Sequence, residues 1–108
     1  MTKNDYSYGW GKLYCAVLCL TGIGNQRDRL YNALIALHPL IFRPEEKHLP
    51  KEIQADFVKF WQEMTSVKAI GKEGDIRATV NSLDEMKIGQ AIEKIISFYD
   101  TVCRCQKP

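Results

Sequence analysis

Four cysteines and two histidines are the side chains in this sequence that are best suited to nucleophilic or metal-binding chemistry. Cys15 and Cys19 are four residues apart, and Cys103 and Cys105 are two apart. Neither spacing is the Cys-x-x-Cys pair typical of structural zinc. Cys15 and Cys19 also lie in an apolar run with helical character, where a free cysteine behaves as a small hydrophobe. We therefore expect core packing for these thiols, with no metal and no cofactor.

The histidines do not belong to a recognisable catalytic motif. His38 precedes Pro39 at the end of a predicted helix, and His48 lies in a polar loop beside Lys47. Nucleophilic catalysis needs a nucleophile, a base and a group that orients the base, and the sequence has no G-x-S-x-G element. We therefore predict no catalytic residue. A small Cys/His enzyme or metal-binding protein, using Cys15 or Cys19 with His38, remains a less favoured hypothesis.

The charge balance does not single out nucleic acid as a partner. The chain has 15 Lys plus Arg against 13 Asp plus Glu, a net charge of +2. Dedicated nucleic-acid binders usually carry a larger basic excess or a concentrated basic stripe. The alternative hypothesis of a nucleic-acid-binding helical domain rests on four scattered cations: Arg27, Arg29, Lys47 and Lys51.

Small residues recur along the first predicted helix. Gly11, Cys15 and Cys19 are spaced by four residues, and Gly22 follows three later. Residues at this spacing share one helix face, and small side chains let another helix approach closely. The stripe indicates either tight packing within the domain, which we favour, or a face for self-association.

Two segments carry candidate partner-binding residues. The aromatic residues Tyr6, Tyr8 and Trp10 come before or at the start of the first helix, and tyrosine and tryptophan are enriched in binding hot spots. The longest irregular stretch, residues 38–50, carries apolar and basic side chains between prolines. Its candidates are Ile41, Phe42 and Arg43.

Apolar residues repeat with helical period through the rest of the chain, and no run alternates with period two. We expect helices over about 8–21, 25–37, 50–67 and 82–104, and a short helix over 75–81. The predicted fold is an all-α compact bundle of four main helices plus one short helix, without a sheet. The predicted core is Leu13, Val17, Leu30, Leu34, Leu37, Ile53, Phe57, Phe60, Trp61, Met64, Ile76, Ile88, Ile92, Ile95 and Tyr99.

Helix ends have their own sequence signals. Asn25 predicts the N-cap of the second helix, and Gly22 predicts a C-terminal cap with positive φ. Ser82 and Glu85 have the spacing of a capping box at the start of the last helix. The first helix is apolar on nearly all sides, which is typical of a helix that is central in its domain or at an oligomer interface.

A chain of 108 residues has the size of one domain. We expect a flexible segment over residues 1–7, one helical domain over 8–104 and a flexible tail over 105–108. The apolar run Leu13 to Ile23 is shorter than the roughly 18–20 residues that a membrane span needs, so we expect no membrane partner. The cysteine pattern and the lack of a convincing signal peptide predict a cytoplasmic protein.

With neither catalytic nor metal motifs, a helical bundle of this kind usually acts by presenting surface. We expect a small protein-interaction or regulatory module rather than an enzyme. Its expected partner is another protein, with a second copy of the same chain among the candidates.

Overall fold

The computed structural model describes residues 6–41, 48–71 and 74–105, and all regular structure in these ranges is helical. The helices are α1 (Ser7–Leu20), α2 (Gln26–Leu37), the short 3-10 helix η1 (His38–Leu40), α3 (Lys51–Met64), α4 (Gly74–Ser82) and α5 (Glu85–Cys105). For this part of the chain, the prediction of an all-α bundle with four main helices, one short helix and no sheet is confirmed.

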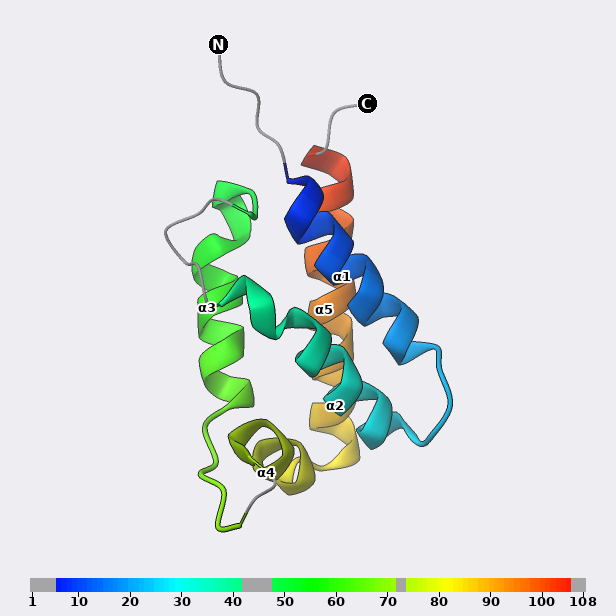
Figure 1. The fold of residues 1–108 in the computed structure, drawn as a ribbon, viewed down its shortest axis with the longest axis vertical. Helices are drawn as coiled ribbons and strands as arrows, with labels where there is room; N and C mark the ends of the chain where they lie inside the picture. The colour runs from blue at the N-terminus through cyan, green and yellow to red at the C-terminus, as the bar shows by residue number, and fades with distance from the viewer. Residues whose placement is uncertain (1–5, 42–47, 72–73, 106–108) are drawn as a thin grey trace.

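The helices pack around α5, the longest of them. α1 and α2 lie along each other, and both contact α5. α4 packs on α2 and α3 at the other side of the bundle (Figure 1). The start of α1 and the end of α5 lie at the same end of the molecule, so these two helices run side by side in opposite directions (Figure 1).

The turn between α1 and α2 confirms one predicted cap and corrects another. The Asn25 side chain accepts a hydrogen bond from the Asp28 N–H at 2.8 Å, as expected of an N-cap. Gly22 does not have positive φ; Gly24 does, at 108°. The reason is that Thr21 closes α1, with its hydroxyl donating to the Leu18 carbonyl at 2.8 Å, so the chain reverses later.

The start of α5 also differs from the prediction. Ser82 still belongs to α4, and its hydroxyl donates to the Thr79 carbonyl at 2.6 Å. The N-terminal cap of α5 is Asp84, whose carboxylate accepts from the Lys87 N–H at 2.8 Å. The predicted capping box at Ser82 was therefore wrong, because the chain needs that residue to finish the preceding helix.

The core contains most of the predicted residues and several that the prediction missed, of which Phe98 is the largest. Phe98 is buried and meets Phe57 and Phe60 edge-on, at centroid distances of 5.5 and 5.6 Å. Val17, predicted as core, is only half-buried and lies outside the core cluster. The predicted core residues Ile76, Ile92 and Tyr99 are half-buried at its margin.

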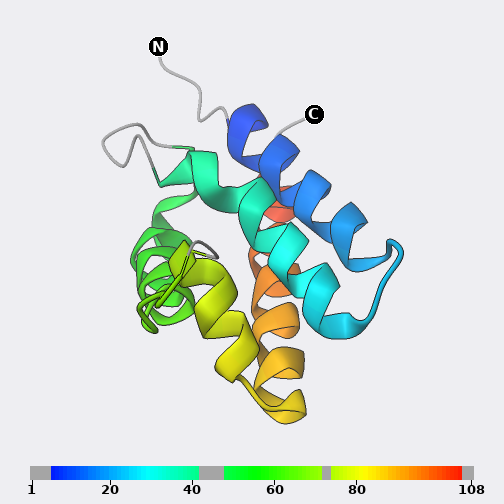
Figure 2. The same cartoon turned by 60° about the horizontal axis from the view of Figure 1, so that its bottom comes forward.

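Helix α1 lies on the outside of the bundle (Figure 1, Figure 2). It buries only Gly9, Leu13 and Ala16, although Lys12 is the sole charged residue among its 14. Apolar helices that are this poorly covered are unusual in a monomer, since exposed apolar area raises the free energy of the folded state. The expectation of a central helix was wrong, and the expectation of an oligomer interface remains.

Candidate interaction surface

The predicted N-terminal aromatic residues do not form one patch. Tyr6 is half-buried against the core. Tyr8 is exposed, with its ring centroid 4.6 Å from that of His48. Trp10 lies two positions further round the helix and stacks on Tyr14 at 5.1 Å. Successive helical residues are about 100° apart, so Tyr8 and Trp10 belong to different sides of α1.

The remaining predicted residues are spread over several parts of the molecule. Ile41 is half-buried and lines a cavity of about 340 Å³ beside α3. Phe42, Arg43 and Lys47 lie outside the described residues. Gly11 is half-exposed and Cys15 is exposed, whereas Cys19 packs against the core.

The predicted cations that the structure describes serve different parts of the fold. Arg27 donates hydrogen bonds to the backbone carbonyls of Val80 and Leu83, the latter at 2.7 Å. Arg29 has a buried Nε without a hydrogen-bond partner. Lys51 is exposed in the first turn of α3. The starts of α2 and α3 lie at opposite ends of the bundle, so these cations do not form one stripe (Figure 1).

All four cysteines are free thiols. Across residues 6–41, 48–71 and 74–105, the structure brings together no group of three or more His, Cys, Asp or Glu side chains that could hold a metal ion. In the same ranges, no helix has the combination of length and apolar composition that crossing a bilayer requires.

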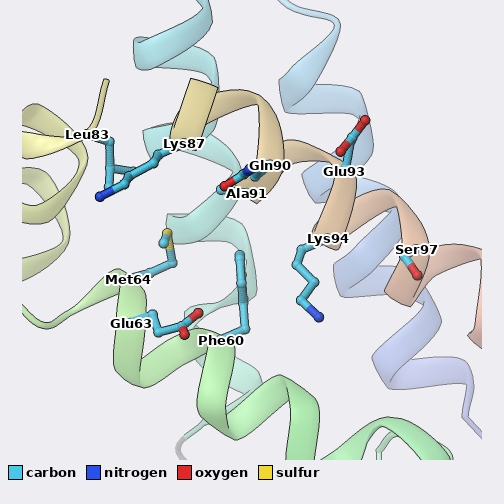
Figure 3. Close-up of a pocket in the computed structure, with 10 residues that line it drawn as sticks. All are labelled: Phe60, Glu63, Met64, Leu83, Lys87, Gln90, Ala91, Glu93, Lys94 and Ser97. Atoms are coloured by element: carbon cyan, nitrogen blue, oxygen red, sulfur yellow. The ribbon is translucent and has the colours of Figure 1, made fainter. Parts of the chain in front are cut away.

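A groove of about 580 Å³ runs between α3 and α5 (Figure 3). Its apolar floor includes Phe60 and Met64 from α3 and Ala91 from α5. Charged side chains from both helices line it, and Lys94 extends from α5 toward α3 (Figure 3). These three floor residues are already buried, with at most 7% of their surface exposed, so the groove leaves little apolar area for a guest to cover.

A second surface, on the adjoining side of α5, leaves more apolar side-chain area exposed. We define the α1–α5 surface as the side chains that face outward where these two helices lie together: Trp10, Tyr14, Val17, Leu18, Ile92, Ile96, Tyr99 and Cys103. Tyr14, Leu18 and Ile96 are 41%, 50% and 47% exposed. No residue in the set carries a formal charge at neutral pH, and the two helices place these side chains on adjacent stripes.

Three aromatic rings join the two helices at the centre of this surface. Trp10 and Tyr14 are stacked within 6° of parallel, and the Tyr99 centroid lies 6.3 and 6.4 Å from theirs. A hydrogen bond with the Cys103 side chain and partial burial raise the pKa of Tyr99, whereas a hydrogen bond with Trp10 lowers it. Because the net shift is upward from a value near 10, Tyr99 stays neutral at physiological pH.

Sequence reasoning found Trp10 but missed most of this surface. A signal was present on α5, where Ile92, Ile96, Tyr99 and Cys103 repeat at spacings of four, three and four. This stripe is displaced from the buried one, which contains Ile88 and Ile95. A helix with two apolar stripes has one more than its own core needs.

Comparison with known proteins finds no matching family model, no matching curated protein sequence and no matching solved structure. Support for a function therefore comes from the chemistry of the chain's own residues.

Proposed function

We propose that this chain is a small helical protein-interaction or regulatory module that binds a partner protein through the α1–α5 surface. The observation that carries the proposal is the set of half-exposed apolar side chains, among them Tyr14, Leu18 and Ile96, on two helices that lie side by side and are joined by aromatic rings. Single exposed apolar residues are ordinary on protein surfaces, whereas a contiguous apolar patch marks an interaction site.

The residue types support the same proposal. Trp10, Tyr14 and Tyr99 are aromatic anchors, and their mutual stacking limits the rotamer freedom that binding would otherwise remove. Covering apolar area contributes about 25 cal/mol per Å², so a partner gains most where these side chains are still exposed. Leu18 on α1 and Ile96 on α5 add further exposed apolar area.

The test is a photo-crosslinking amino acid placed at position 18 of the full chain in its native cells. Position 58 is the matched control, because Val58 is similarly exposed, at 42%, but lies on α3. We expect a discrete cross-linked protein from position 18 and none from position 58. We also expect the position-18 product to disappear when Ile96 is replaced by Glu, which puts a charge into the surface.

Cross-links of equal yield from both positions would contradict the proposal, as would a position-18 product that survives Ile96→Glu. The circular dichroism spectrum of Ile96→Glu checks that the helices remain. Since Ile96 is half exposed, we expect the spectrum of the variant to match that of the wild type.

A further inference from the structure

The α1–α5 surface has edges of opposite charge. Trp10, Tyr14 and Val17 form the side of α1 next to α5, which puts Lys12 on the other edge, with its ammonium 5.3 Å from the Tyr8 ring centroid. Lys12 is the single charged residue of α1. The surface is therefore bounded on the α1 side by a cation.

The opposite edge of the surface carries more carboxylates than cations. Beyond Ile96 on α5 lie Glu93 and Asp100, seven residues apart on the same side of the helix and both exposed. Arg104 lies on the same edge and pairs with Asp100 at 3.0 Å, so Glu93, Asp100 and Arg104 together give this edge a net charge of −1. The order across the surface is thus a positive edge, an uncharged centre and a negative edge.

We infer that the partner at the α1–α5 surface is a second copy of this chain, related by a two-fold axis that runs parallel to α1 and α5. The inference rests on the proposed function and names its partner. Such an axis lies in the interface and places α1 of one copy over α5 of the other. Each Lys12 then faces the acidic edge of the second copy.

The charge pattern favours this axis over the in-plane axis perpendicular to it. A two-fold axis across the helices would place α1 on α1, so that Lys12 would approach its own equivalent and the acidic edges would meet. Like charges opposed at an interface disfavour it, and opposite charges fix its register. An uncharged centre adds no repulsion when it is doubled, which a self-complementary interface requires.

The first test is sedimentation equilibrium of the purified full chain with reductant, over a concentration series. We expect a monomer–dimer equilibrium that Leu18→Glu weakens by at least about 30-fold, the loss typical of a hot-spot residue. Val58→Glu is the matched control and should leave the dissociation constant unchanged. A monomer at about 1 mM, or equal effects of the two variants, would overturn the inference.

The second test reverses the edges. At low salt, Lys12→Glu and the double change Glu93→Lys with Asp100→Lys should each weaken the dimer by about 3- to 10-fold, because each opposes like charges. All three changes together should restore the wild-type constant. If the triple variant instead loses as much dimer affinity as the Lys12 change and the double change combined, the axis we infer is wrong. Thermal unfolding of each variant excludes a loss of fold.

The two proposals fail in different ways. If the purified chain is monomeric and position 18 cross-links in cells to a protein of another mass, self-association is overturned and the interaction module stands. If the chain is monomeric and position 18 gives no cross-link, both are overturned. A cross-linked product of twice the mass of the chain supports both.

Discussion

At the scale of single residues, Gly9 lies where α1 meets the backbone that leads into α3. It is buried, and a Cβ atom built there would overlap the His48 carbonyl oxygen and come within 3.1 Å of a Leu49 methyl carbon. The obstructing atom is backbone, which cannot move aside as a flexible side chain can. Gly9 therefore sets how closely α1 approaches this segment.

Replacing Gly9 by Ala should lower the free energy of unfolding by about 1–3 kcal/mol, the range for overpacking a core. The matched control is Gly11→Ala on the same helix, where a Cβ would meet nothing within 4 Å. Alanine there should be neutral or stabilise by up to about 1 kcal/mol, because glycine is a poor helix former. Urea denaturation measures the free energy of unfolding of both variants. Equal effects would mean that the backbone around His48 moves aside to make room for the added Cβ atom.

Asp75 ties the start of α4 to the turn before it. Its carboxylate accepts from the Ala69 N–H at 2.9 Å and lies 3.3 Å from the Lys68 ammonium. The Ala69 hydrogen bond, followed by that of Lys68, lowers the pKa of Asp75 below its ordinary value of 3.8. A lowered folded-state pKa means that the ionised carboxylate stabilises the fold.

The sign of the pH dependence follows from linkage. The contribution of Asp75 is fully present above the unfolded-state pKa and is lost as the pH falls through the lower folded-state pKa. Asp75→Asn should therefore unfold at a lower temperature than the wild type at neutral pH, and the gap should narrow below about pH 4. Melting temperatures of both proteins between neutral and acidic pH measure this. A gap that stays constant would show that Asp75 contributes through shape alone.

At the scale of elements, α4 is held to α2 by side chains rather than by a large apolar contact. Arg27 binds the carbonyls at the end of α4, and Arg77 pairs with Asp28 at 2.9 Å. α4 buries only Thr79 and Val80. Helices with so few buried residues depend more on such hydrogen bonds for their local stability.

Arg27→Met keeps the length of the side chain and removes its donors. We expect the backbone amides of α4 to exchange with deuterium about tenfold faster, since hydrogen bonds to a charged group contribute about 1.5–3 kcal/mol and 1.4 kcal/mol corresponds to tenfold. The exchange of α3 should change less. Lys51→Met is the control because Lys51 is exposed on α3. Unchanged amide exchange rates in α4 would mean that packing alone, without the Arg27 hydrogen bonds, keeps this helix in place.

The helices themselves could be predicted because their apolar periodicity is strong, as in the stripe of Ile53, Phe57 and Phe60. Their ends were harder to predict, since Ser82 and Asp84 are both good capping residues and only the fold decides between them. The position of α1 could not be predicted from its composition. An apolar helix satisfies the same pattern whether the chain covers it or a partner does.

At the scale of the whole molecule, the sequence predicts a protein that acts through its surface, but it does not indicate the α1–α5 surface that we propose for this role. Trp10 was identified by residue type alone. Tyr14 and Leu18 were treated as part of an apolar helix, and Ile96 as part of the last apolar run. Their common exposure depends on how α1 lies against α5, which involves residues about 80 positions apart. Local periodicity carries no information on such a contact.

The two tryptophans of the chain lie in different environments, and this makes its own fluorescence informative. Trp61 is buried between Phe57 and His38, with ring centroids at 6.3 and 5.7 Å, whereas Trp10 lies on the α1–α5 surface. In Trp61→Phe, the emission of Trp10 should shift to shorter wavelength as the concentration rises through association. In Trp10→Phe, the emission wavelength of Trp61 should not depend on protein concentration and should shift only on unfolding. Association and folding can thus be followed separately by light, in one small chain and without a label.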